Sequence, residues 1–592
     1  MKNYIKLMMI DFTKPWWRII LDQKWLATGI IVSVILRDVF WALVPFLIAF
    51  VLESSNWYFF AGACFLWFLS ELNFIVLPPF VARFQLQCIH GVLYSAHQYL
   101  LIIDPQYHVK RSSGVILAKI DRAARGYEEV LDQITYEFAP LAIGIATMLA
   151  ILSQYSLILT AAVAFCLSIM IGYGYYFARY ACQKWENAFI KTDDDFRATS
   201  FENLAQVHLI RATFATDYMR DKLTNKININ SEVERELWLS YASTSKVLSV
   251  FYTISILLLL GFFVYRVQNN LTSLTFAIGL ILAYIQSTKQ LIKILHPFRR
   301  YMRGYAAIKD LFEFMPQFGK QTIPVFEGQN ILVEKTKPNN LIAQNLLFGY
   351  DQAMIFNGHN LKIESLKDPQ NNLYGIIGPS GVGKTTLISI LGGQLKPLSG
   401  AVMISGIDIY NVIDNTRRQL IALQGQIATS VKGTVRYNLL FGLPENHNYS
   451  DEYLFEILRR VGLEKILLEH QGLETMLGEG ALNISGGQRQ RLNFAALYLR
   501  ATYYKPAVIM IDEPTSSLDE ISELAVTSMI KELSEFAITL VIAHRLKTLK
   551  DAIGLIDLSL LSESNEIKVY SSEELENHSN YYRRLLEGKD EF

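Results

Sequence analysis

A run of glycines followed by a lysine and two threonines has the composition of a phosphate-binding loop. The pattern G-x-x-x-x-G-K-[ST] is filled by Gly378, Pro379, Ser380, Gly381, Val382, Gly383, Lys384, Thr385 and Thr386. Apolar runs at 373–377 and 387–391 predict a buried strand before the loop and a helix after it. Backbone N–H groups of such a loop and the helix N-terminus together favour a phosphate. We therefore predict a nucleotide site, with Lys384 on the β- and γ-phosphates and Thr385 on Mg²⁺.

Two neighbouring carboxylates further along the chain suit the same chemistry. Asp512 ends the apolar run 507–511, which predicts a strand with a carboxylate at its C-terminal end. We expect Asp512 to hold Mg²⁺ and Glu513, directly after it, to polarise the attacking water. The alternative for Glu513 is a solvated loop acid, and the phosphate-binding loop argues against it.

Further residues follow in an order that fits one nucleotide site. One predicted helix opens with the turn Ser485, Gly486, Gly487 and Gln488. A helix N-terminus binds anions, although on its own such a turn is an ordinary cap. His544 follows another apolar strand and is expected to sense the γ-phosphate, while the common alternative is a structural histidine. Tyr350 precedes the loop and offers an aromatic face to adenine. The segment Ser516–Asp519 follows Glu513 and is expected to bridge two subunits.

The composition is that of a membrane protein. Of 592 residues, 51% are hydrophobic and only 19% are charged, with a mean hydropathy of +0.22. A net charge of +0 gives no argument for a nucleic-acid partner. The four cysteines have no metal-ligand spacing and lie in or near apolar segments, so a disulfide framework is not expected.

Six apolar runs predict six transmembrane helices in the first half of the chain. They cover Leu26–Val51, Trp57–Phe80, Phe138–Leu152, Leu157–Phe177, Val247–Tyr265 and Leu274–Ile285. Short loops join the spans in pairs, and the long connections between pairs carry most of the basic residues. By the positive-inside rule, the long connections and both termini are expected in the cytoplasm. Residues 1–25, with three tryptophans among cations, are expected to form an interfacial amphipathic helix.

Several polar residues fall inside the predicted spans. They are Arg37, Asp38, Glu71, Asn73, Gln286 and Lys289. Charge inside a membrane is costly, so it usually faces a bundle interior or a watery cavity. A local pairing of Arg37 with Asp38 that serves only packing is the alternative.

These patterns predict an α-helical membrane domain of six spans with long cytoplasmic extensions, followed by an α/β ATPase domain. The membrane domain is assigned to 26–314, a linker to 315–340, the α/β domain to 341–570 and a charged tail to 571–592. The long connections are expected to be helices that project into the cytoplasm, with coupling segments near 106–122 and 200–215.

The chain resembles an ATP-binding cassette (ABC) transporter of the exporter type, in the half-transporter form. The resemblance rests on the six spans, on Gly378–Thr386, on Ile484–Gln488 as the signature and on Asp512-Glu513. It implies that Tyr350 is the A-loop tyrosine, Gln426 the Q-loop glutamine and a Mg²⁺ ligand, and His544 the switch histidine. It also places Glu479 just before the signature. Ile484 stands where leucine is usual, and Gly425 where proline is common, so the nearby Gln424 remains the alternative to Gln426.

The resemblance implies ATP and Mg²⁺ as cofactors and a dimer in which each ATP lies between Lys384 of one chain and Ser485 of the other. A homodimer is the default expectation, and a related half-transporter is the alternative partner. Lys384, Gln426, Glu513 and His544 form the expected catalytic set. The expected function is ATP-driven export or flipping of a lipid, hydrophobic compound or peptide across a bilayer. The alternatives are inward transport of a metal chelate and a non-pumping regulatory protein. A bacterial inner membrane is the expected location, with an organelle membrane as the alternative.

Overall fold

The computed structural model describes most of the chain. The described residues are 10–54, 57–102, 113–177, 179, 183–315, 328–333, 339–350, 353–365, 371–478, 484–515, 518, 520–543 and 546–587. They form two compact units, a helical unit up to α12 and an α/β unit from β1 onward. Each unit is described by itself.

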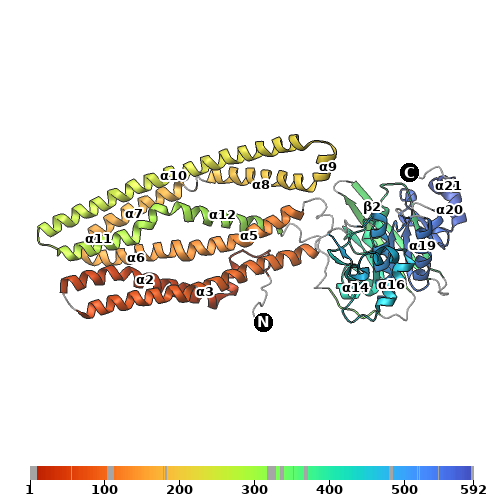
Figure 1. Cartoon of the computed structure of the whole chain (residues 1–592), viewed down its shortest axis with the longest axis horizontal. Helices are drawn as coiled ribbons and strands as arrows, with labels where there is room; N and C mark the ends of the chain where they lie inside the picture. Colours follow the sequence, from red (N-terminus) through yellow and green to blue (C-terminus); the bar gives the residue numbers. More distant parts are fainter. Residues whose placement is uncertain are drawn as a thin grey trace. The chain divides into compact units, whose positions relative to one another are not determined.

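The helical unit consists of long helices (Figure 1). They are α1 (Arg18–Asp22), α2 (Lys24–Ser54), α3 (Trp57–Ile102), α5 (Ser113–Asp132), the π-helix η1 (Gln133–Phe138), α6 (Ala139–Tyr155), α7 (Leu157–Phe177), α8 (Gln183–Ala205), α9 (Val207–Ala212), α10 (Thr216–Gln268), α11 (Leu274–Thr288), the 3₁₀ helix η3 (Lys289–Lys293) and α12 (Leu295–Phe314). The six predicted spans lie in α2, α3, α6, α7, α10 and α11. Five stretches are long and apolar enough to cross a membrane, and α11 contributes a shorter apolar helix. The predicted six-helix membrane domain is therefore confirmed in outline.

The long extensions are continuations of the spans themselves. α3 has 46 residues and α10 has 53. At about 1.5 Å per residue these helices are far longer than the roughly 30 Å of a bilayer core. Figure 1 shows the α2–α3, α6–α7 and α10–α11 connections at one end of the unit, and the short helix α9 between the far ends of α8 and α10. The segment predicted near 200–215 is therefore a tip. The start of the segment predicted at 106–122 lies outside the described residues, which resume at Ser113.

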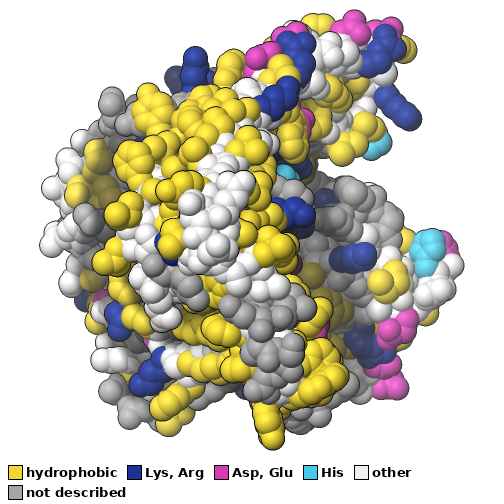
Figure 2. Space-filling model, turned by 90° about the vertical axis from the view of Figure 1, so that its left-hand side faces the viewer, with side chains coloured by type: hydrophobic (Ala, Val, Ile, Leu, Met, Phe, Trp, Pro, Cys, Tyr) yellow, Lys and Arg dark blue, Asp and Glu magenta, His cyan; other side chains and the backbone are white. Residues whose placement is uncertain are grey.

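Apolar side chains cover the outside of the membrane-spanning part. Ile158, Phe165 and Leu257 are 85%, 67% and 61% exposed. In Figure 2 hydrophobic side chains cover much of the face in view, while charged side chains gather at the top, where Figure 1 places α9 and the start of α10. Such a surface is costly in water and matches the hydrocarbon of a bilayer.

The N-terminal segment differs from the expected continuous helix. In the described part, residues 10–17 form turns and only Arg18–Asp22 is helical before α2 begins. Phe12 lies edge-on to Tyr99 and Phe312, and the ring of Trp16 meets Tyr127. Phe12 and Trp16 therefore pack inward onto α3, α5 and α12, whereas Trp17 is 49% exposed.

A close crossing joins α5 to α12. A Cβ added at Gly126 would lie 2.6 Å from the Gly304 carbonyl oxygen, and one at Gly304 would lie 2.7 Å from the Gly126 carbonyl oxygen. Only glycine lets two helix backbones approach this closely. Lys119 Nζ bonds Asp310 at 2.6 Å, and Arg303 pairs with Glu129, so ion pairs flank the crossing.

The α/β unit contains two five-stranded sheets and a two-stranded one. Its strands are β1 (Asn340–Tyr350), β2 (Ala353–Glu364), β3 (Leu373–Ile377), β4 (Ser399–Ile404), β5 (Ile407–Asp408), β6 (Ile421–Gln424), β7 (Gly433–Thr434), β8 (Met476–Leu477), β9 (Val508–Asp512), β10 (Ile538–Ile542), β11 (Gly554–Asp557) and β12 (Glu566–Ile567). Its helices are α13 (Lys384–Leu391), α14 (Asp414–Leu420), α15 (Val435–Leu439), α16 (Asp451–Arg460), α17 (Glu464–Leu468), α18 (Gly486–Tyr504), α19 (Glu520–Ser534), α20 (Ser572–His578) and α21 (Asn580–Leu586), with 3₁₀ turns η5 (Gly472–Glu474), η7 (Leu546–Leu549) and η8 (Leu558–Leu560).

The two large sheets differ in direction and in burial. One has the order β12-β2-β1-β4-β5 and is mainly antiparallel. The other has the order β11-β3-β10-β9-β6, and all its pairs are parallel. Every residue of β3, β9 and β10 is buried, which explains why these strands are continuous apolar runs in the sequence.

Candidate nucleotide site

The parallel sheet brings the predicted chemical residues to one edge. Strand β10 lies between β3 and β9, and Ile542 pairs with Ile376 on one side and with Asp512 on the other. The carboxyl ends of parallel strands share an edge, where ligands of such sheets bind. Three segments therefore leave the sheet at the same edge: the glycine loop after β3, Asp512-Glu513 at the end of β9, and Ala543 after β10.

The glycine loop has the backbone that encloses an anion. Gly378, Gly381 and Gly383 have φ values of +144°, +81° and +107°, which side chains with a Cβ rarely adopt. The chain then enters α13 at Lys384, so the first N–H groups of this helix point back toward the loop. This geometry forms a cradle for a phosphate.

Lys384 is held inside that loop. Its Nζ donates hydrogen bonds to the carbonyl oxygens of Gly378 and Pro379 at 2.7 and 3.0 Å, and the residue is 8% exposed. Burial lowers the pKa of Lys384, and the nearby carboxylates of Glu513 and Asp512 act in the opposite direction. A buried ammonium group among carbonyls and carboxylates is suited to receive phosphate oxygens.

Asp512 and Glu513 lie at the end of β9 in different environments. Asp512 is 1% exposed, whereas Glu513 is only partly buried. Glu513 has a φ of +49°, which is rare and strained for a residue with a side chain. Its N–H bonds the Ile542 carbonyl at 3.0 Å, and the Gln490 amide donates to its carbonyl at 2.5 Å. Two neighbouring elements therefore hold Glu513 in this conformation.

Of the two candidate glutamines, Gln426 lies beside Glu513. The Nε2 atom of Gln426 donates to Glu513 Oε1 at 3.0 Å. Gln424 belongs to β6 and is 7% exposed, packed against the sheet. The position of Gln426 favours it as the residue that senses the occupied site.

Tyr350 reaches the same region from the antiparallel sheet. Its hydroxyl lies 3.1 Å from Thr386 Oγ1 in the first turn of α13. Its ring meets Phe348 edge-on with centroids 5.2 Å apart. Tyr350 is thus fixed next to the phosphate cradle, where an adenine ring could stack on it.

The signature turn caps α18. The Ser485 hydroxyl accepts the Gln488 N–H at 3.2 Å, and the Gln488 side chain accepts the Ser485 N–H at 2.8 Å, which is a complete capping box. Ser485 and Gly486 are exposed, and Gly487 is half-buried. Within the described residues, no hydrogen bond joins Ser485 to the phosphate cradle of the same chain. The helix N-terminus is thus open for a ligand presented from elsewhere.

The predicted Mg²⁺ ligands supply oxygen donors, which this ion prefers. Thr385 is exposed at the start of α13, Asp512 lies at the end of β9, and Gln426 follows β6. The described residues contain no cluster of three or more His, Cys, Asp or Glu side chains arranged for a metal. This donor set fits an ion that is also held by nucleotide phosphates, and it would supply charge neutralisation there.

Some predicted residues lie outside the described part of the chain, and one contributor was missed. His544, Ser516, Ser517, Asp519 and Glu479 are not among the described residues. Gln490, which holds the Glu513 backbone and is 5% exposed, was not predicted. The available signal was its position in the first turns of α18, two residues after Gln488, because the chain passes from α18 directly to β9.

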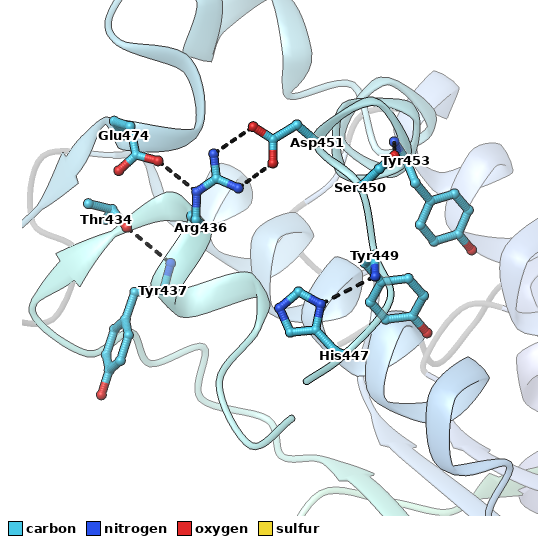
Figure 3. A network of polar contacts seen from close by, with 9 residues as sticks. All are labelled: Thr434, Arg436, Tyr437, His447, Tyr449, Ser450, Asp451, Tyr453 and Glu474. Atoms are coloured by element: carbon cyan, nitrogen blue, oxygen red, sulfur yellow. Dashed lines mark hydrogen bonds and ion pairs between the residues drawn. The ribbon is translucent and has the colours of Figure 1, made fainter. Parts of the chain in front are cut away.

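A charged cluster fixes the segment that follows Gln426. Figure 3 shows Arg436, at the start of α15, between Asp451 and Glu474. Its guanidinium makes two bonds to Asp451, one of them 2.8 Å long, and donates to Glu474 at 2.6 Å. These carboxylates raise the pKa of Arg436. The cluster ties α15 to the start of α16 and to η5, and so holds these three elements together.

Comparison with known proteins agrees with this geometry. Residues 361–516 match the family model described as ABC transporter. The chain therefore carries the ATP-binding domain of an ABC transporter. A solved bacterial Atm1-family ABC exporter with ATP bound superimposes on 96% of this chain and 99% of its own, with a TM-score of 0.79 and 18% identity. The chain as a whole thus has the fold of an ABC exporter.

Sequence relatives point to the same class. A multidrug resistance ABC transporter ATP-binding and permease protein of Lactococcus lactis subsp. lactis is 28% identical over 60% of this chain and 58% of its own length. An ATP-dependent lipid A-core flippase of Chromohalobacter salexigens is 26% identical over 63% of this chain and 61% of its own length. The matched region spans less than two thirds of either relative.

Proposed function

We propose that this protein is a dimeric ATPase that exports or flips a lipid, a hydrophobic compound or a peptide across a membrane. One observation carries the proposal. Lys384, Asp512, Glu513 and Gln426 meet at one edge of the parallel sheet in a chain that also has six apolar helices. A nucleotide site alone would suit many enzymes. A nucleotide site together with several membrane-spanning helices is typical of a transporter.

Each residue has a role that follows from its position. Lys384 and the N–H groups of the glycine loop bind the phosphates, and Tyr350 stacks on adenine. Thr385, Asp512 and Gln426 hold Mg²⁺. Glu513 orients the attacking water and accepts its proton, because its carboxylate is only partly buried and stands beside Gln426. His544 is assigned to the γ-phosphate by its place after β10.

A second chain completes the site in this proposal. Ser485, Gly486 and Gly487 present a capped helix N-terminus that no described hydrogen bond links to their own phosphate cradle. Two copies related by a two-fold axis would each offer this turn to the other's nucleotide, which gives two equal sites. The full motif set in one chain supports a homodimer.

We propose that the tip at α9 is a coupling segment. None of the residues of α9 is buried. Around it Leu204, Leu209 and Phe214 are 74%, 59% and 92% exposed, and they lie at the end of the unit opposite the short connections. Apolar side chains exposed at a helix tip favour a protein partner, and a coupling segment would carry ATP-driven movement into the membrane-spanning helices.

Export is favoured over the alternatives. The relatives' names describe multidrug resistance and lipid flipping, and these favour outward movement over import of a metal chelate. The retained Glu513 argues against a protein that does not hydrolyse ATP. The apolar outer surface places the chain in a bilayer as a multi-pass protein, and we assign it to a bacterial inner membrane with the ATPase in the cytoplasm.

The test is ATP hydrolysis by the full chain, expressed alone and held in lipid nanodiscs. Glu513→Gln should lower hydrolysis about 100-fold or more while ATP still binds, since only proton acceptance is lost. Glu469→Gln, an exposed carboxylate on the same unit, serves as the matched control and should be unaffected. Hydrolysis that survives Glu513→Gln would contradict its role. Absence of hydrolysis in the well-folded parent chain would contradict the homodimer.

A further inference from the structure

The helical unit contains a buried ion pair that the ATP chemistry does not use. Arg37 of α2 is 2% exposed and donates to the Asp38 carboxylate at 2.7 and 3.1 Å. It also donates to the Thr135 carbonyl of η1 at 3.4 Å, and its guanidinium lies 5.1 Å from the Phe74 ring centroid. The two charges therefore neutralise each other inside the unit, where an unpaired charge would be very costly.

Glu71 lies at the exposed edge of the face of α3 that meets α2. The Trp67 ring is 6.0 Å from the Trp41 ring, Ser70 Oγ donates to the Arg37 carbonyl at 3.5 Å, and Phe74 lies beside Arg37. Residues three and four apart share a helix face, so the contacts of Trp67 and Phe74 with α2 place Glu71 on the same side. The carboxylate is thus on the α2–α3 seam.

Glu71 has no opposite charge to neutralise it. Its side chain is exposed, and Trp67 Nε1 donates to its Oε1 at 3.3 Å. In the described part of the chain no ion pair to Glu71 is present, including from Lys289, which follows α11. Because Arg37 and Asp38 cancel, the seam carries one net negative charge.

Glu71 lies at a depth in the membrane where a carboxylate without a paired cation is costly. Glu71 and Trp41 each lie about four helical turns, or roughly 20 Å, from the end at which α2 and α3 are joined. That distance is well inside a hydrocarbon core of about 30 Å. Ionisable groups at such depth usually mark a pathway or a site, since they are expensive to maintain.

Two tryptophans lie near the carboxylate: Trp67 donates its N–H to Glu71, and Trp41 lies next to Trp67. Trp41 and Trp67 are 39% and 47% exposed and stand edge-to-face. Gln286 of α11 donates to the Trp41 carbonyl at 3.2 Å, which ties a third helix to this position. Indole rings attract cations at their faces and bind apolar bodies at the same time.

We propose that Glu71, Trp41 and Trp67 form a binding site for an amphiphilic organic cation, one positive charge on an apolar or aromatic body. This proposal rests on the proposed transport function and names the substrate class that the membrane unit selects. Glu71 would pair with the cationic group, and the two indoles would cover the apolar body. Anions are excluded by the net negative charge of the seam, and neutral lipids gain nothing from Glu71.

The test is binding of tetraphenylphosphonium to the full chain in nanodiscs by equilibrium dialysis without ATP, with empty nanodiscs subtracted. Tetraphenylborate, which has the same shape and the opposite charge, is the paired probe. We expect the parent chain to bind the cation in preference to the anion. Glu71→Gln should weaken cation binding at least 10-fold, Glu71→Asp should retain most of it, and Trp67→Phe should weaken it several-fold.

Glu232→Gln, an exposed carboxylate on α10 outside the predicted spans, is the matched control and should bind as the parent does. Equal cation binding in Glu71→Gln, no protein-dependent cation binding by the parent, or preference for tetraphenylborate would each overturn the site. Glu513→Gln should still bind the cation, because this measurement needs no hydrolysis. A parent chain that hydrolyses ATP but binds no cation would disprove this site alone, whereas cation binding without hydrolysis would disprove the pump alone.

Discussion

The two units of this protein treat buried charge in opposite ways. In the α/β unit, Lys384 at the start of α13 and Asp512 at the end of β9 are buried, and Lys384 donates to backbone carbonyls of its own loop. In the helical unit, Arg37 and Asp38 are buried side by side and bond each other. The first arrangement leaves charged groups able to bind a ligand. In the second, the two charges neutralise each other.

This difference shows how each unit obtains specificity. The nucleotide site depends on strand register, because Ile376, Ile542 and Asp512 form one row and the loops after them are preset. The helical unit has no such row, and in our proposal a few side chains on helix faces select what it binds. One ATPase site could then serve many cargoes, while residues such as Glu71 would select the cargo.

The largest effect is expected when the turn that caps α18 is blocked. Ser485→Arg should lower ATP hydrolysis about 100-fold or more, since it removes an anion-binding turn and fills its space with a long cation. Ser571→Arg removes the matching capping box of α20, far along the chain from the site. Both variants should lose about 1 kcal/mol of folding free energy, but only Ser485→Arg should stop turnover. Equal turnover in the two variants would mean that Ser485 is only a cap.

A second prediction concerns the α5–α12 crossing of the helical unit. Gly126→Val should lower the free energy of unfolding by roughly 1–3 kcal/mol, because its Cβ would collide with the Gly304 carbonyl oxygen. Gly261→Val is the control, since a Cβ there meets nothing within 4 Å. Thermal unfolding of the full chain in detergent measures both. Similar melting temperatures for the two variants would contradict the close crossing.

The smallest effect is expected at the Arg436 cluster. Arg436→Gln should lower the free energy of unfolding by about 1 kcal/mol or less, since these ion pairs are partly exposed. Arg459→Gln breaks a local pair with Glu464 and should cost less still. High salt should narrow the gap between Arg436→Gln and the parent chain. A large loss of hydrolysis in Arg436→Gln would show that the cluster does more than hold α15, α16 and η5 together.

Much of the fold could be predicted from sequence because its signals are local. A span is a run of apolar residues, so all six predicted runs lie in helices. The P-loop is a short pattern whose glycines require positive φ, and Gly378, Gly381 and Gly383 have it. The predicted N-terminal helix was too long. In the described part only the short helix after Pro15 forms, because Phe12 and Trp16 pack on other helices instead.

The sequence by itself determined the order of the elements, the apolar spans and the candidate residues for phosphate and Mg²⁺, because each follows from composition or short spacing. Only the tertiary structure placed Gln426 rather than Gln424 beside Glu513, revealed Gln490 behind Glu513, showed the hydrogen bonds between Arg37 and Asp38, and placed Trp67 against Glu71. Those contacts join residues far apart in the chain or depend on which helix face meets a neighbour. Strand order and helix packing fix them, and neither is written in a local pattern.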